Sequence, residues 1–196
     1  MYKYLAIFFI FLNCFPLKAE DRTVEEGRAQ IRLSTGEVLK VDRDKHFPLP
    51  LYFVDGKFPE GTRYQIDILK SDFQYIYVVG SDRKNNAGVI YSPEKPIEPE
   101  SEYYPMILPS SRSFIAIDGK SDKDYVTILF SNIPLNPKDI VEKIISSPGD
   151  YYDKLKMALE GRYAKPADVR CIMNKIGFIS LTDSKIVPIT FEMEHR

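Results

Sequence analysis

The stretch DFQYIYVVGSD, residues 72–82, decides the fold. In an extended chain, successive side chains point to opposite faces. One face of this stretch carries Phe73, Tyr75, Tyr77 and Val79, and the other carries Ile76 and Val78. Both faces are apolar, which is typical of a strand that is covered on each side. We therefore interpret the aromatic stripe as buried scaffold of a packed sandwich rather than as an exposed docking surface.

Most of the other segments also carry strand signals. The 196 residues include twelve Phe and thirteen Tyr, and aromatic residues favour strands. Short alternating runs are separated by turn residues, except where helix signals begin at the caps Asn136 and Asp150. The first helix has an apolar face, formed by Ile140, Val141, Ile144 and Ile145. The sequence therefore predicts a mainly β fold, an antiparallel β-sandwich with one or two C-terminal helices inserted before the last strands.

Turn residues and prolines predict where the sheets have edges. Residues 29–42 alternate around the turn pair Thr35-Gly36, which indicates a hairpin. Residues 46–61 contain three prolines and are expected to form a loop or a sheet edge. Pro188 indicates that residues 185–194 form an edge strand or a bulged strand.

The first nineteen residues have the layout of a secretory signal peptide. Lys3 precedes the apolar run Leu5–Leu12, and the small residue Ala19 precedes Glu20. The run is too short to span a bilayer comfortably. We expect cleavage after Ala19 and export to the periplasm or the extracellular space.

Cys14 offers an alternative end to the signal. The stretch FLNC, residues 11–14, loosely resembles a bacterial lipobox, whose cysteine becomes lipidated. The alternative product is a structural lipoprotein tethered to the outer membrane through Cys14, and only this product would contact a membrane. Cleavage after Ala19 leaves Cys171 alone, so no internal disulfide is possible. We interpret Cys171, which has apolar neighbours, as a buried small hydrophobe.

Neither histidine lies in a recognisable catalytic motif. His46 follows a charged loop and His195 is the penultimate residue, where chains fray, so both are interpreted as solvated surface groups. Nucleophile elbows, phosphate-binding loops and Cys or His metal motifs do not occur in the sequence. We predict no catalytic residues, no cofactor and no metal site. The net charge of −1 gives no reason to expect nucleic acid as a partner.

An acidic loop is the densest group of carboxylates. Asp118, Asp122 and Asp124 lie close together, but Lys120 and Leu129 occupy positions where a calcium loop needs oxygen ligands. We interpret the loop as a solvated hairpin turn. A small carboxylate-dependent envelope hydrolase is the alternative, and it requires two carboxylates roughly 5–10 Å apart in a cleft.

A second surface feature lies among the prolines that follow residue 92. Tyr103, Tyr104 and Met106 form a possible partner-binding surface, because aromatic residues in loops often mark contacts. The other interpretation is that they fold back over the end of the sandwich.

Several ordered pieces resemble the bacterial domain of unknown function 4384 family. They are FPEGTRYQIDI, DFQYIYVVGSD, VIYSP, ILPSSRSFIAID and KDYVTILFSNIPLN. The matching positions are Gly61, Tyr64, Tyr75, Tyr77, Tyr91, Pro93, Pro109, Asp124, Tyr125, Leu129, Ser131, Pro134 and Leu135. Ser92 departs from the pattern, which often has FP or YP there. The chain's ending also looks like that of exported, Bacteroidetes-like members of the family.

The resemblance implies an immunoglobulin-like β-sandwich over about residues 58–136. It implies no established activity and no catalytic residues. Residues 20–57 would then form an N-terminal hairpin and a proline-rich connection, and residues 137–196 would add the helical insertion and the closing strands to the same domain. We expect a non-enzymatic binding module of the cell envelope, whose partner is a protein or an envelope polymer bound at edge strands and aromatic loops.

Overall fold

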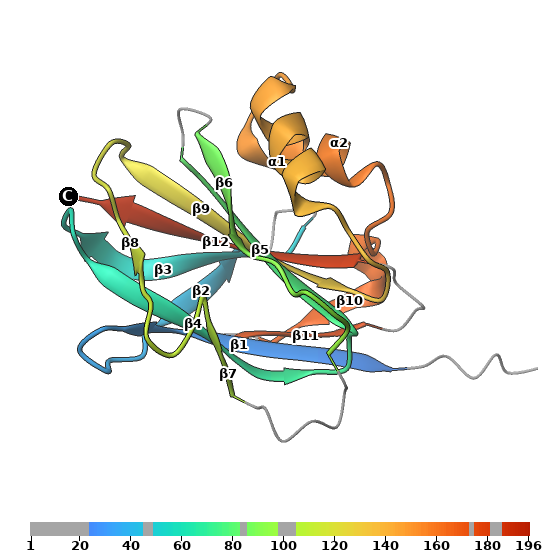
Figure 1. Ribbon diagram of the computed structural model, residues 1–196, viewed down its shortest axis with the longest axis horizontal. Coiled ribbons are helices and arrows are strands. Elements are labelled where there is room, and N and C mark those ends of the chain that lie inside the picture. The colour runs from blue at the N-terminus through green and yellow to red at the C-terminus, as the bar shows by residue number, and fades with distance from the viewer. Residues whose placement is uncertain (1–23, 45–48, 83–85, 98–104, 173–174, 181–185) are drawn as a thin grey trace, which may run out of the picture.

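A computed structural model describes residues 24–44, 49–82, 86–97, 105–172, 175–180 and 186–196. In these residues the protein is mainly β, with two facing six-stranded sheets and two α-helices that precede the final strands (Figure 1). The predicted β-sandwich with helices before its last strands is therefore confirmed. The immunoglobulin-like connectivity stays a prediction. No helix in the described part of the chain is long and apolar enough to cross a membrane.

The first sheet, called the β1 sheet, follows the order β10-β11-β1-β4-β7, and β8 also pairs with β4. Its strands are β1 (Glu25–Leu33), β4 (Arg63–Ser71), β7 (Met106–Leu108), β8 (Ile115–Ala116), β10 (Val169–Cys171) and β11 (Ile176–Ser180). A short 3-10 helix, η1 (Pro166–Asp168), leads into β10. All pairings in this sheet are antiparallel.

The second sheet, called the β12 sheet, follows the order β2-β3-β12-β9-β5-β6. Its strands are β2 (Val41–Asp44), β3 (Leu51–Phe58), β5 (Tyr75–Asp82), β6 (Ala87–Tyr91), β9 (Lys123–Ser131) and β12 (Ile186–His195). β12 runs antiparallel to β9 and parallel to β3. The strand that comes last in the sequence therefore lies in the interior of the sheet.

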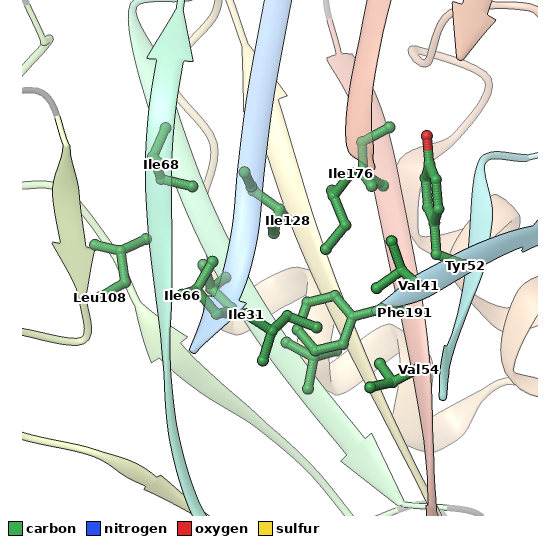
Figure 2. Close-up of a cluster of buried hydrophobic side chains, with 14 of the residues drawn as sticks. Ile31, Val41, Tyr52, Val54, Ile66, Ile68, Leu108, Ile128, Ile176 and Phe191 are labelled. Atoms are coloured by element: carbon green, nitrogen blue, oxygen red, sulfur yellow. The ribbon is translucent and has the colours of Figure 1, made fainter. Parts of the chain in front are cut away.

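The main core fills the space between the two sheets (Figure 2). Ile31 and Ile66 from the β1 sheet and Ile128 and Phe191 from the β12 sheet are all fully buried. Each sheet therefore turns an apolar face inward.

A second core lies between the β12 sheet and the helices α1 (Pro137–Ser146) and α2 (Tyr151–Leu159). The helices cover the outer face of that sheet (Figure 1). Buried hydroxyls add polar contacts here, because Thr127 Oγ1 lies 2.7 Å from both Tyr151 Oη and Thr190 Oγ1. With a core on each face, β9 and β12 are buried along most of their length.

The aromatic strand is buried as predicted, with one change of face. Ile76 belongs to the main core and Tyr77 to the core under the helices, where its hydroxyl accepts a 2.9 Å hydrogen bond from the Leu135 N–H. Tyr75 is only half-buried. Phe73 lies before β5 and turns into the main core, so it does not share the face of Tyr77.

Both predicted helix caps are confirmed. The Asn136 side chain accepts from the Lys138 N–H, and the Asp150 side chain accepts from the Asp153 N–H. Ile145 corrects the predicted apolar face, because it is 49% exposed. Each helical residue turns the side chain by about 100°, which carries Ile145 past Ile144 and away from the sheet.

The proline signals gave one wrong prediction, a loop or edge where β3 lies, and one that holds only in its second form, a bulged strand, because β12 is interior. Residues 51–58 form β3, which pairs with β2 on one side and β12 on the other. Its prolines lie just outside the strand, at positions 50 and 59. Pro188 lies in the interior strand β12, but the ladder with β3 begins only at Thr190, so its missing N–H interrupts no pairing with β3. β12 does have a register shift at its far end, between Glu192 and Glu194.

The predicted hairpin at residues 29–42 is also only partly present. After β1 the chain turns back, and the Leu39 N–H donates to the Ile31 carbonyl at 2.9 Å. It then crosses to the other sheet, where β2 pairs with β3 and not with β1. The segment therefore closes one side of the sandwich instead of extending one sheet.

Candidate functional site

A pocket of about 530 Å³ opens beside β1. It lies where the chain crosses from the β1 sheet to the β12 sheet. Its walls come from β1, the crossing segment, β4 and the start of β11, and they consist of Arg28, Ala29, Gln30, Ile31, Val38, Leu39, Lys40, Val41, Leu69, Ile172, Lys175 and Ile176. We call this the β1 pocket. Its volume lies in the range of small-molecule sites, about 300–1,000 Å³.

The pocket exists because β11 and the returning chain after β1 pair with the same edge of β1 and leave a gap between them. On one edge of β1, pairing with β11 ends where Ala29 faces Ile176. Farther along the same edge, pairing with the returning chain begins at Ile31, whose carbonyl accepts from Leu39. Gln30 lies between these two points. The wall of the sandwich is therefore open over about one residue of strand.

The inner part of the pocket is apolar. Ala29, Ile31, Val41 and Ile176 are 0–8% exposed and belong to the main core, and Figure 2 shows the last three within it. Val41 comes from the β12 sheet and the others from the β1 sheet, so the pocket reaches between the two layers.

The mouth of the pocket combines exposed apolar side chains with cations. Val38 and Leu69 are 46% and 41% exposed, unlike most large hydrophobic residues of the protein. The cations are Arg28, Lys40 and Lys175, and no carboxylate of the described residues lines the pocket. The mouth is therefore amphipathic and positive.

Two acids on β1 and β4 are bound to other groups. Glu26 pairs with Lys70 and Arg28, and hydrogen bonds from these two cations lower its pKa. Asp67 accepts hydrogen bonds from Arg32 and Gln30 at 2.8–2.9 Å. Burial raises the pKa of Asp67, but these hydrogen bonds outweigh burial and hold the pKa below its usual value. Among the described residues, no carboxylate is paired with Lys40 or Lys175.

The carboxylates predicted as the alternative site lie elsewhere, at the β5–β9 end of the β12 sheet. Asp118 and Asp124 line a pocket of about 150 Å³ together with Asp82, which faces Asp124 across the β5–β9 ladder. Asp118 pairs with Lys120 at 3.2 Å, and Asp82 accepts from the Asn86 backbone and side chain. Asp122 is exposed and does not line this pocket. Two of the three predicted acids therefore converge, while the third does not.

His195 corrects the prediction of a solvated, fraying end. It belongs to β12 and is buried, with Nδ1 2.6 Å from the Ser121 carbonyl and Nε2 3.1 Å from Asp124 Oδ2. Burial raises the pKa of Asp124, as do the neighbouring acids Asp118 and Asp82, while His195 opposes the shift. The ring therefore ties β12 to the loop before β9. His46 lies outside the described residues.

No group of three or more His, Cys, Asp or Glu side chains with metal-binding geometry occurs in the described ranges. Cys171 packs at the margin of the main core, where burial raises the pKa of its thiol. Cys171 is therefore half-buried rather than buried as predicted, and its raised pKa keeps the thiol protonated and weakly nucleophilic.

The predicted aromatic partner surface is described only in part. Met106 begins β7 and packs, half-buried, against the main core. Tyr103 and Tyr104 lie outside the described residues, as do Cys14 and the whole predicted signal peptide.

Sequence reasoning missed the β1 pocket. The alternation in residues 29–33 does place Ala29 and Ile31 on one face. No local signal shows that β11 stops opposite Ala29, or that Lys40 and Lys175, 135 positions apart in the sequence, flank the same opening.

Comparison with known proteins gave no match. No family model, no curated protein and no solved structure matches this chain. The resemblance to the domain of unknown function 4384 family therefore stays a prediction.

Proposed function

We propose that the protein is an exported, non-enzymatic binding module of the bacterial cell envelope, and that the β1 pocket is its binding site. The observation that carries the proposal is the combination of a partly apolar opening into the core with a positive mouth. Pockets of this size with a few convergent polar groups are the usual places where proteins hold small molecules or side groups.

The β1 pocket fits a projecting part of a larger partner or a free small molecule. Its 530 Å³ is far too small for a folded domain. A protein or an envelope polymer would therefore insert only one apolar group here, while exposed edges such as β2 and β6 remain for wider contacts.

Native mass spectrometry tests the proposal. The processed protein is freed of bound material, incubated with an envelope extract from bacterial cells, and compared with a variant carrying both Lys40→Glu and Lys175→Glu. We expect one adduct per protein chain, reduced in the variant and unchanged in Lys138→Glu, which reverses an exposed charge on α1. Absence of any adduct, or equal loading of all three proteins, contradicts the proposed site.

The same experiment reports the mature N-terminus. A chain that begins at Glu20 supports cleavage after Ala19. A lipidated Cys14 supports the tethered lipoprotein and places the β1 pocket near the membrane surface. A chain that retains Met1 overturns export through the predicted signal.

A carboxylate-dependent envelope hydrolase is the second candidate, because Asp118 and Asp124 converge on one small pocket. Incubation of the protein with envelope glycans and analysis of the released sugars tests it. Sugar release that is lost in Asp124→Asn, with thermal unfolding of that variant unchanged, supports the hydrolase and contradicts a purely binding role.

A further inference from the structure

We propose that the β1 pocket holds the hydrocarbon chain of a single-chain carboxylic acid, with the carboxylate at the mouth. This inference rests on the proposed function, because it names the ligand class of the same site. The interior walls are aliphatic, and the described lining carries Lys40 and Lys175 together with Arg28, which is paired with Glu26. An amphiphile with one apolar chain and one negative head matches both parts.

The two lysines each lie just before a strand, Lys40 before β2 and Lys175 before β11. Leu39 and Ile176 are buried, and their neighbours Lys40 and Lys175 are exposed. The lysines therefore lie at the surface while their neighbours line the interior. The two ammonium groups therefore flank the opening between β11 and the crossing segment, where a carboxylate would be attracted to both.

Other occupants fit less well. A peptide strand needs a run of free backbone groups on β1, but the opening spans only Gln30. A sugar needs several hydrogen-bonding groups. Among the described lining residues, Gln30 is the only uncharged polar side chain, and none is aromatic. A chain of methylene groups needs only the aliphatic walls.

Exposed apolar residues at the mouth extend the aliphatic walls of the β1 pocket outward. Val38 and Leu69 are 46% and 41% exposed, and both line the β1 pocket. A hydrocarbon chain that enters past them would cover apolar surface that otherwise faces water, which favours binding in proportion to the area covered.

Isothermal titration of a series of straight-chain alkanoic acids tests the inference, with each acid kept below the concentration at which it aggregates. We expect one site per chain, with affinity rising about fourfold for each added methylene until the pocket is filled, the equivalent of about 0.8 kcal/mol. Alkanols of equal length lack the charge and should bind more weakly. The difference between acid and alkanol should shrink as salt is raised.

Two variants distinguish binding of the ligand's carboxylate from binding of its hydrocarbon chain. Lys40→Glu combined with Lys175→Glu should weaken the acids by roughly tenfold or more and leave the alkanols nearly unchanged, because the lysines are exposed and bind only the carboxylate. Lys138→Glu, on the far side of the other sheet, should change neither. Ala29→Leu adds bulk to the inner wall and should weaken both classes. Circular dichroism and thermal unfolding confirm that each variant is folded.

The outcomes separate the ligand class from the proposed site. Acids that fail to bind, or that bind the lysine variant as well as the unchanged protein, overturn the ligand class. If an envelope adduct is still lost in the lysine variant, the proposed binding function stands with another ligand. If neither the alkanoic acids nor any envelope component binds in the pocket, both the ligand class and the proposed binding function are contradicted.

Discussion

Truncation of Tyr77 on β5 tests whether the aromatic strand is scaffold. Tyr77 is 3% exposed and packs in the core under the helices, and its hydroxyl accepts a 2.9 Å hydrogen bond from the Leu135 N–H. Tyr75 lies two residues earlier on the same face, with its ring stacked on that of Tyr77 at 6.1 Å between centroids, but it is only half-buried. The pair therefore differs mainly in burial.

The expected cost follows from the buried area. An aromatic side chain buries about 150 Å² or more, and at about 25 cal/mol per Å² its loss removes roughly 4 kcal/mol. We expect Tyr77→Ala to lower the free energy of unfolding by about 3–5 kcal/mol, in the range measured for large-to-small core changes. Tyr75→Ala should cost less, because its side chain is only partly buried in the folded protein. Tyr77→Phe should cost about 1 kcal/mol, the value of one hydrogen bond.

Urea unfolding followed by far-ultraviolet circular dichroism measures all three variants. The chain has no tryptophan, so the backbone signal is the better probe. Equal losses for Tyr75→Ala and Tyr77→Ala, or a loss below about 1 kcal/mol for Tyr77→Ala, would refute the burial reasoning and restore the docking interpretation of this strand.

Two further predictions concern the β1 sheet. Arg32→Ala should lower the free energy of unfolding at pH 7 by about 1–3 kcal/mol, because Asp67 is 5% exposed in its side chain and loses two of its hydrogen bonds. Because the pKa of Asp67 is lowered on folding, its ionised form stabilises the protein above the unfolded pKa of 3.8, and this stability is lost as the pH falls through the folded pKa. The destabilisation by Arg32→Ala should therefore be smaller at pH 3 than at pH 7, as measured by urea unfolding at both pH values. An equal destabilisation at the two pH values would show that Asp67 is not the group involved. Gly27→Ala should lower the free energy of unfolding by about 1–3 kcal/mol, since its Cβ would lie 2.4 Å from Phe178 Cε1. Gly88→Ala has open space around the new Cβ and should be nearly neutral in the same urea assay. Equal effects at the two glycines would mean that the Phe178 ring moves aside at no cost.

Local signals predicted local structure well. The helix caps Asn136 and Asp150 act through groups within three residues, and both are found where the sequence indicates. The alternation in residues 75–79 likewise reports burial on both faces, because each strand residue meets only its own side of the sheet.

Signals that depend on distant partners were less informative. Pro188 suggested an edge, but whether a proline is tolerated depends on where the neighbouring strand begins, which is set by β3 more than 130 residues earlier. His195 suggested a frayed end, but its burial depends on Ser121 in the loop before β9 and on Asp124 in β9 itself. The β1 pocket belongs to this class as well, since it forms where two unrelated partners of β1 stop short of each other.

The interior position of β12 has a consequence for when the protein can fold. Synthesis delivers the chain from its N-terminus, so β3 and β9 emerge well before the strand that joins them. Until residues 186–195 arrive, β3 and β9 each have an open edge where β12 will pair. Pairing that spans more than 130 residues also closes slowly, because a long loop must be ordered first. Cooperative folding of the β12 sheet therefore waits for residues 186–195, however early its other strands are made.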